Sequence, residues 1–392
     1  MTRTTNLRRH RRSAAVALFA TACLTVTACS STAAPNEDTG TDGGTVAIGN
    51  TGPLSDLIDM SEVCGDEPVT VGLVDGFGTN SWSRILRAEV EDEAQKCPAI
   101  EGVEYAAGRG DLQATLSAIT GMTAKGVDIL LVVPSAGPGA SHLPAIQAAH
   151  AAGVVVVPIA ADPTGTPGTD YFDYVDWDTR HDGVLWAQWM VDRLGAEGGN
   201  VVLLGGPAGN AVSQQELEGI NEVFATAPQI NVLTPEPVTT NWDPAMTQQA
   251  MAGLLARYPQ IDGVISDYGT ATMGAIRAFQ SAGRPLVPIA TTDDNELSCL
   301  FDDAKADNPA FELATVSART WIGRVGLRKA LAQINGLDNP EPSLIQLSLY
   351  EDSTGAADGA VTPADACQPA LPPGASPSSQ LSADDLAALF EG

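Results

Sequence analysis

The sequence predicts an α/β fold of two doubly wound, parallel-sheet lobes. From Val69 onward, short β-branched apolar runs alternate with amphipathic helical stretches, as in βαβ units. The pattern then restarts: VGLVDGFGTN (71–80) and VVLLGGPAGN (201–210) are similar strand-and-loop sequences, and each leads into a helix. A strand, a helix and another strand follow the second half. Three connections between the two lobes would account for these extra segments.

The first half begins with a buried strand at 69–74, whose loop DGFGTN tolerates unusual backbone angles. Ile85, Leu86, Val90 and Ala94 then recur on one face of a helix that begins near Ser81. Asp111 is a suitable N-cap for the next helix. We expect the further strands and helices of this half at 112–122, 128–133, 142–152 and 154–159.

In the second half, Asp243-Pro244 marks the start of a helix, since Asp caps and Pro fits the first turn. We expect helices at 182–194, 211–224, 244–258 and 271–282, with strands at 200–204, 261–266 and 286–291. The extra segments are strands 313–317 and 344–349 around a helix at 321–335. A short helix at 383–390 ends a Gly/Ala/Pro/Ser-rich C-terminal stretch.

The N-terminus predicts export. Five arginines precede an apolar segment at 13–27 that is too short to span a bilayer, which is typical of a signal peptide. Val26-Thr27-Ala28-Cys29 resembles a bacterial lipobox, so we expect residues 1–28 to be removed and Cys29 to carry lipid. An ordinary signal peptide cut nearby is the alternative. Residues 29–67 are expected to be a flexible tether to the outer face of the cytoplasmic membrane.

The net charge argues against some classes of binding partner, and the cysteine content predicts disulfides. The signal takes five of the 20 basic residues and none of the 48 acidic ones, leaving 15 against 48, a formal charge of −33. Such a charge repels nucleic acid and anionic lipid.

Four cysteines remain besides those in the signal and at the lipobox, and they suggest two disulfides: Cys64, Cys97, Cys299 and Cys367. Local geometry favours Cys64–Cys97 and leaves Cys299–Cys367, although two other pairings stay open. Without a Cys/His cluster we expect no metal and no cofactor.

Polar and aromatic residues gather where the predicted strands end. In an open parallel sheet, ligands bind at the carboxyl ends of the strands. The side chains there are Asp75, Asn80, Trp82, Ser135, Asp162, Asp267, Tyr268, Asp293 and Asp294. Together they suit a neutral polyol such as a monosaccharide, since carboxylates and amides bind hydroxyls and aromatic faces pack on apolar ring faces. Alternatively, these polar residues only cap helices and Trp82 packs on the sheet.

No enzyme class is favoured. The chain has no G-x-G-x-x-G spacing, no P-loop and no G-x-S-x-G. Composition does not exclude a hydrolase with paired carboxylates, but no residue is marked as acid, base or nucleophile. We therefore expect a non-enzyme.

Residues 69–349 resemble the type I periplasmic-binding-protein superfamily, in particular the ribose/galactose-type solute-binding proteins of ABC transporters. The stretches that carry the resemblance are TNSWSRILRAEVEDEA, VDWDTRHDGVLWAQWMVDRLG, DYGTATMGAIRAFQSAG and TTDDNE. The resemblance implies lobe 1 at 68–174 plus 319–338 and lobe 2 at 175–318 plus 339–355, joined by a three-stranded hinge. Residues 356–392 would be a C-terminal extension.

The resemblance also implies ligand contacts. Asn80 and Trp82 fall on the polar and aromatic contacts of the first loop. Asp162 lies within one or two positions of an Asp-Arg sugar clamp, but the adjoining Arg is absent. Gln214 stands where sugar binders often place an arginine.

Later positions depart further from the pattern. Tyr268 replaces the usual Asn, Asp293 matches the acidic contact, and a Gln position falls on Ala318, with Arg319 beside it. Trp177 and Trp321 would lie near the interlobe crossings.

The implied function is an extracytoplasmic, lipid-anchored and monomeric solute-binding protein. It would grip a small neutral ligand, first of all a monosaccharide, by hinge closure and deliver it to an ABC permease. The alternatives are a ligand-sensing subunit for a membrane receptor, or a binder of a nucleoside or an aromatic polar compound. A repressor effector domain shares the fold but would not explain the export signal.

Overall fold

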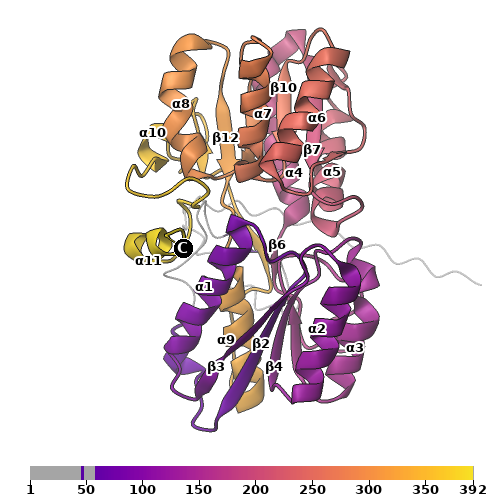
Figure 1. Cartoon of the computed structure of the whole chain (residues 1–392), viewed down its shortest axis with the longest axis vertical. Helices are drawn as coiled ribbons and strands as arrows, with labels where there is room; N and C mark the ends of the chain where they lie inside the picture. The colour runs from indigo at the N-terminus through magenta and orange to yellow at the C-terminus, as the bar shows by residue number, and fades with distance from the viewer. Residues whose placement is uncertain (1–45, 48–57, 392) are drawn as a thin grey trace, which may run out of the picture. The chain divides into compact units, whose positions relative to one another are not determined.

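The computed structural model describes residues 46–47 and 58–391 (Figure 1). The predicted signal peptide, the lipidation at Cys29 and most of the predicted tether lie outside the described residues.

The first lobe is built on a parallel four-stranded sheet of order β3-β2-β4-β5. Its strands are β2 (Val69–Asp75), β3 (Ile100–Ala107), β4 (Ile129–Val133) and β5 (Val155–Pro158). Its helices are α1 (Ser81–Gln95), α2 (Leu112–Lys125), α3 (Leu143–Ala151) and α9 (Ile322–Asn335). Ile129 and Leu131 of β4 join α1 and α9 in one core, whereas Leu130 and Val132 join α2 and α3 in another. The sheet is therefore buried on both faces, as its continuous apolar strands predict.

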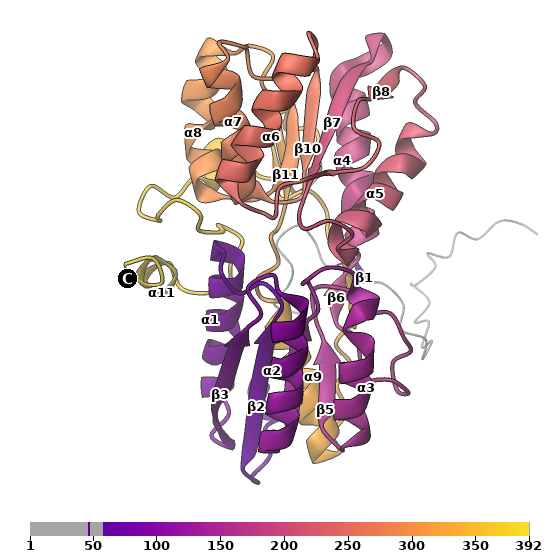
Figure 2. The same ribbon diagram turned by 45° about the vertical axis from the view of Figure 1, so that its right-hand side comes forward.

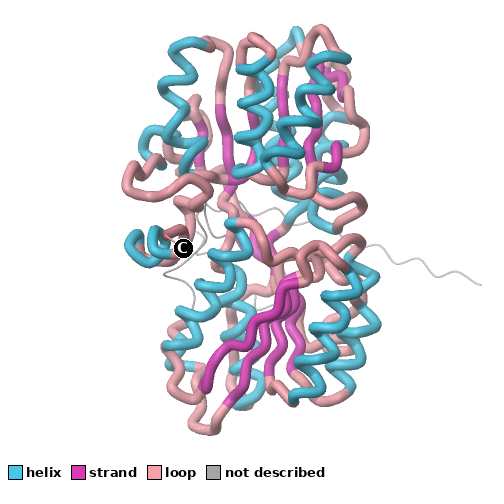
Figure 3. The backbone as a smooth tube through the Cα atoms, in the orientation of Figure 1, coloured by secondary structure: helices cyan, strands magenta, loops and turns pink. Residues whose placement is uncertain are grey.

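The second lobe is built on a sheet of order β14-β12-β11-β10-β7-β8, with β9 also paired to β7. Figure 2 labels β11, β10, β7 and β8 of this sheet, and Figure 3 shows its strands in magenta. Only β14 is antiparallel. The strands are β7 (Gly199–Gly205), β8 (Ile230–Val232), β9 (Val238–Thr239), β10 (Gly263–Ser266), β11 (Ile289–Thr292), β12 (Leu313–Val316) and β14 (Glu351–Asp352). Helices α4 (Thr179–Leu194) and α5 (Ala211–Phe224) cover one face. Helices α6 (Pro244–Arg257), α7 (Gly269–Ser281) and α8 (Asn295–Asp307) cover the other.

Within residues 58–391, three segments connect the lobes. β6 (Asp176–Trp177) and β13 (Leu344–Gln346) are parallel strands of a small sheet that β1 (Val46–Ala47) completes. The remaining connection, residues 317–321 between β12 and α9, is not a strand. The predicted three-stranded hinge is thus present, but its third strand comes from the N-terminal segment.

The strand orders place two loop clusters at the centre of the molecule. In each sheet the chain moves first to one side of the opening strand and then to the other, so neighbouring loops diverge. This divergence creates a crevice at the carboxyl ends of β2 and β4 in the first lobe, and of β7 and β10 in the second. Asp75 ends β2, and Asp267 follows β10.

The C-terminal residues extend from the second lobe to the first. β14 pairs with β12, and a disulfide joins Cys367, just after α10 (Pro363–Ala366), to Cys299 of α8. Leu371, Ala375 and Leu386 then pack on Ile85 of α1, where α11 (Ala383–Ala388) lies (Figure 1). We call residues 367–391 the C-terminal strap. The other disulfide joins Cys64 to Cys97, so the favoured pairing is the observed one.

Several elements differ from the sequence prediction. β3, β8, β9 and α8 were not predicted. β3 is a partly exposed edge strand with Glu101 and Glu104 among its apolar residues, so it lacks a continuous apolar run. α8 carries Asp and Lys between few apolar positions, although Asp294 caps it by accepting from Glu296 N at 2.9 Å. α4 begins at Thr179, earlier than predicted, because Asp178 caps it.

Candidate ligand-binding site

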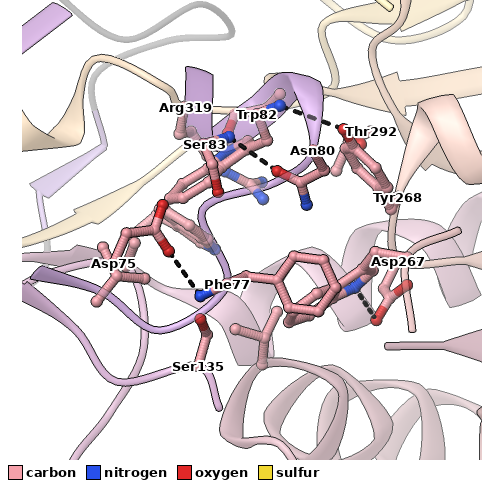
Figure 4. A pocket seen from close by; sticks show the side chains of 16 residues that line it. Asp75, Phe77, Asn80, Trp82, Ser83, Ser135, Asp267, Tyr268, Thr292 and Arg319 are labelled. Atoms are coloured by element: carbon pink, nitrogen blue, oxygen red, sulfur yellow. Dashed lines mark hydrogen bonds between the residues drawn. The ribbon is translucent and has the colours of Figure 1, made fainter. Parts of the chain in front are cut away.

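The two loop clusters face a shared cavity with an unfilled volume of about 540 Å³, its open mouth included (Figure 4). Residues of both lobes and of the connections line it. They are Asp75, Phe77, Asn80, Trp82, Ser83, Val133, Ser135, Ala160, Trp177, Val212, Trp242, Asp267, Tyr268, Thr292, Ala318 and Arg319.

Asn80 and Trp82 belong to the start of α1. Asn80 Oδ1 accepts from Ser83 N at 2.9 Å, so this residue caps the helix and also lines the cavity. Trp82 Nε1 donates to the Ala318 carbonyl at 2.7 Å, and its ring meets Trp177 edge-to-face at 6.5 Å. The two predictions for Asn80, that it caps a helix and that it lines a ligand site, are therefore compatible.

Tyr268 and Asp267 form part of the wall from the second lobe. The Tyr268 hydroxyl shares a hydrogen bond with Ser81 Oγ at 2.6 Å and accepts from Trp82 N at 3.2 Å, which joins the lobes beside the cavity. Asp267 Oδ2 accepts from Gly206 N, Ser213 Oγ and Trp242 Nε1. Burial raises the pKa of Asp267 to about 6, and these donors oppose the rise.

An aromatic pair in the lining of the cavity joins the two lobes. Phe77, in the first loop of lobe 1, meets Trp242 of lobe 2 edge-to-face, with ring centroids 5.3 Å apart. Asn241 and Trp242 both have positive φ, 53° and 54°, a strained backbone for residues with side chains. Trp242 is held in place by its bond to Asp267, at 3.0 Å.

Arg319 is the cation among the lining residues. Its guanidinium pairs with Asp182 and lies over the Trp177 ring, 4.2 Å from the centroid. Both side chains of the ion pair are 2% exposed. The residue also has a positive φ of 54°, so the connection between β12 and α9 is bent at the site.

Five of the eight predicted contacts line the cavity: Asn80, Trp82, Ser135, Tyr268 and Arg319. Asp162, Gln214 and Asp293 do not. Asp162 Oδ1 accepts from Thr164 N at 2.6 Å and so stabilises its own loop. Gln214 lies exposed on α5. Trp321, expected near a crossing, is buried in the core of the first lobe.

The Asp293 carboxylate forms hydrogen bonds with two other segments of the protein. Its Oδ1 accepts from Ala318 N, and its Oδ2 accepts from Ser378 N of the C-terminal strap at 2.9 Å. Ser378 Oγ donates to Oδ1 at 3.0 Å. The preceding residue, Thr292, lines the cavity instead. Because successive residues of a strand point to opposite sides, a one-residue offset decides which of them meets a ligand.

Sequence reasoning did not select Phe77, Val212, Trp242 or Thr292 as site residues. Phe77 lies in the loop DGFGTN, which follows the first predicted strand, so its position at a strand end could have identified it as a site residue. Trp242 immediately precedes the predicted start of α6 at Asp243-Pro244, but no local pattern shows that this loop reaches the cavity.

The described residues contain no cluster of three or more His, Cys, Asp or Glu side chains arranged to hold a metal. None of the helices in the described ranges has the length and apolarity to cross a membrane.

The two sheets, the hinge and the interlobe cavity define a two-lobed binding protein of the periplasmic-binding-protein-like I fold. Residues 71–300, more than half of the chain, match the periplasmic binding protein domain family. The chain therefore belongs to this family, as the resemblance of its motifs predicts.

Curated relatives include a xylitol-binding protein from Mycolicibacterium smegmatis, 32% identical over 47% of this chain and 51% of the relative. The D-allose-binding periplasmic protein of Escherichia coli is 26% identical over 51% of this chain and 64% of its own. These matches thus span between half and two thirds of the relatives' lengths.

Solved structures share the fold. The binding component of the arabinose ABC transporter from Shewanella sp. ANA-3, bound to L-arabinofuranose, superposes with a TM-score of 0.62. The alignment covers 72% of this chain and 91% of that one at 20% identity.

Proposed function

We propose that this protein is an extracytoplasmic solute-binding protein of an ABC importer, with a neutral sugar or polyol as its ligand. The observation that carries the proposal is the cavity at the ends of both sheets, lined by aromatic rings and a few buried polar groups. The aromatic rings can pack on the apolar C–H faces of a sugar, and the polar groups can form hydrogen bonds with its hydroxyls. Relatives named for binding xylitol and D-allose support the choice of ligand class.

The mechanism is hinge closure without chemistry. A ligand that contacts both lobes stabilises the closed state by its higher affinity for that state. Asn80, Trp82 and Ser135 would hold it from the first lobe, Tyr268 from the second and Arg319 from the connection. A permease in the membrane would then recognise the closed form. Since no bond is made or broken, the ligand should be recovered unchanged.

We also propose that lipid on Cys29 anchors the protein to the outer face of the cytoplasmic membrane. The lipobox-like Val26-Thr27-Ala28-Cys29 after a basic and apolar leader supports this. Cys29→Ser should move the exported protein from the membrane fraction to the soluble fraction. An unchanged distribution would contradict the anchor.

The proposal is tested by a panel of neutral sugars, polyols and nucleosides, with tryptophan fluorescence and thermal unfolding as the measurements. We expect saturable binding of one molecule per chain. At 100 times Kd, the ligand should add about 2.7 kcal/mol to the free energy of unfolding. Small-angle scattering should show compaction. No binding across the panel, together with no compaction, would contradict the proposed function.

A further inference from the structure

Asp75 and Ser135 lie together at the crevice of the first lobe. In the pairing of β2 with β4, Asp75 is opposite Val133, and Ser135 follows two residues later. Both side chains line the cavity, and they are 0% and 5% exposed. Figure 4 shows them on the same wall of the cavity. The sequence resemblance assigns no ligand contact to Asp75.

The Asp75 carboxylate is only half satisfied. Oδ1 accepts from Phe77 N at 2.9 Å, and the neighbouring Ser83 hydroxyl and Gly78 N–H also favour the charged form, whereas Oδ2 has no partner in hydrogen-bonding geometry within the described part of the chain. No ion pair among those residues includes Asp75. Burial raises the pKa of this carboxyl. A buried acceptor without a donor is costly, so its orientation toward a cavity points to a donor on a ligand.

Three more lining residues carry a polar atom with no partner among residues 58–391: Ser135 Oγ, Trp177 Nε1 and Arg319 Nε. Their side chains are at most 5% exposed. Trp177 and Arg319 lie on two of the connections between the lobes. The cavity therefore presents one acceptor, two donors and one hydroxyl that can do both.

This mixture identifies the chemistry of the ligand. A hydroxyl both donates and accepts, so a molecule with several hydroxyls can satisfy all four atoms. An ammonium group only donates and would leave Trp177 Nε1 and Arg319 Nε unpaired. A carboxylate or phosphate on a ligand only accepts hydrogen bonds, so it could not pair with the Asp75 oxygens, which are also acceptors.

We propose that Asp75 is the specificity-determining residue of this site. Its free oxygen accepts a hydrogen bond from one hydroxyl of a neutral polyhydroxylated ligand, while other hydroxyls pair with Ser135, Trp177 and Arg319. Asp75 thereby admits neutral polyols and rejects sugar acids and sugar phosphates. This inference rests on the proposed function and deepens it.

The test compares Asp75→Asn with Asp162→Asn, a matched change of a strand-end aspartate that does not line the cavity. The probes are xylitol, D-ribose and D-allose, followed by the acid and phosphate counterparts of whichever binds. Asp75→Asn keeps Oδ1 for Phe77 but replaces the free acceptor by a donor in one amide orientation. We expect its Kd to rise at least about 10-fold, with Asp162→Asn unchanged. The acid and phosphate counterparts should not bind the unaltered protein.

A structural role for Asp75 is distinguished by the ligand-free protein. If the carboxylate serves a ligand, Asp75→Asn should unfold at the same or a higher temperature, since a buried unpaired charge is removed. A lower unfolding temperature with unchanged Kd would overturn the inference. So would tighter binding of an acid counterpart than of its neutral sugar. If the unaltered protein binds no probe at all, the proposed function fails with it, whereas unchanged binding by Asp75→Asn refutes the inference alone.

Discussion

Asp293 illustrates how a residue predicted to contact the ligand can instead be bound by other parts of the protein. Its two oxygens accept from Ala318 on a connection and from Ser378 on the C-terminal strap. It is 3% exposed and does not line the cavity. Trp82, by contrast, lines the cavity at the start of α1. The two residues should therefore respond differently to truncation.

We expect Trp82→Ala to weaken ligand binding at least about tenfold, or 1.4 kcal/mol, because it removes an aromatic wall of the site. Asp293→Ala should instead lower the free energy of unfolding by about 2 to 4 kcal/mol, because two buried backbone donors lose their acceptor. Isothermal titration and urea unfolding measure the two effects. A normally stable Asp293→Ala that has lost its affinity would return Asp293 to the ligand site.

Helix α1 joins three parts of the molecule. Its N-terminus reaches the cavity, and Glu89 and Glu93 on its buried side pair with Arg324 and Arg328 of α9. Ser379 Oγ and Gln380 N of the C-terminal strap donate to Glu89 at 2.7 and 2.8 Å. A buried ion pair left without one partner is strongly destabilising, so these contacts support one another.

The strap should be held to α1 mainly by its apolar contact. Leu386 is 3% exposed and packs with Ile85, and Arg84 donates to the Leu389 carbonyl at 3.0 Å. We expect Leu386→Ala to cost about 2 to 3 kcal/mol locally and to speed amide exchange in residues 371–391. Leu337→Ala, at a leucine that is 45% exposed, is the control. Equal exchange in both variants would show that the strap does not depend on this contact.

At the scale of the whole molecule, buried acids should govern the response to pH. Burial raises the pKa of Asp176 to about 8 and that of Glu351 to about 7. Burial also acts on Glu93, but the charge of Arg328 and the hydrogen bonds from Lys96, Arg328 and Arg324 together outweigh it and lower the pKa of Glu93. An acid whose pKa is raised by folding stabilises the folded state at low pH, and this contribution is lost as the pH rises through the folded-state pKa. An acid whose pKa is lowered by folding stabilises the folded state at higher pH, and this contribution is lost as the pH falls through the folded-state pKa.

We therefore expect the free energy of unfolding to be highest near about pH 5 and to fall by about 2 kcal/mol or more by about pH 9. Urea unfolding across this interval measures it. Asp176→Asn should flatten part of the decline, because it removes one of the raised groups. A free energy that stays level or increases toward pH 9 would contradict this assignment of the buried acids.

The sequence by itself determined the lobes, most of their helices and strands, and the loops that carry the site. These features follow from local signals: the apolar runs around Leu73 and Leu131, the cap at Asp111, and the Asp243-Pro244 start of α6. Asn80 and Trp82 could be predicted because they lie where the loop after β2 leads into α1, and both the end of this strand and the start of this helix are recognisable.

Only the tertiary structure decided which strand-end side chains meet in the cavity. Thr292 lines it and Asp293 does not, because Asp293 is bound by Ser378, a residue 85 positions away in sequence. Trp242 enters from a loop with a strained backbone and is held by Asp267. Contacts of this kind join segments that are distant along the chain, so local periodicity and propensity carry no information about them.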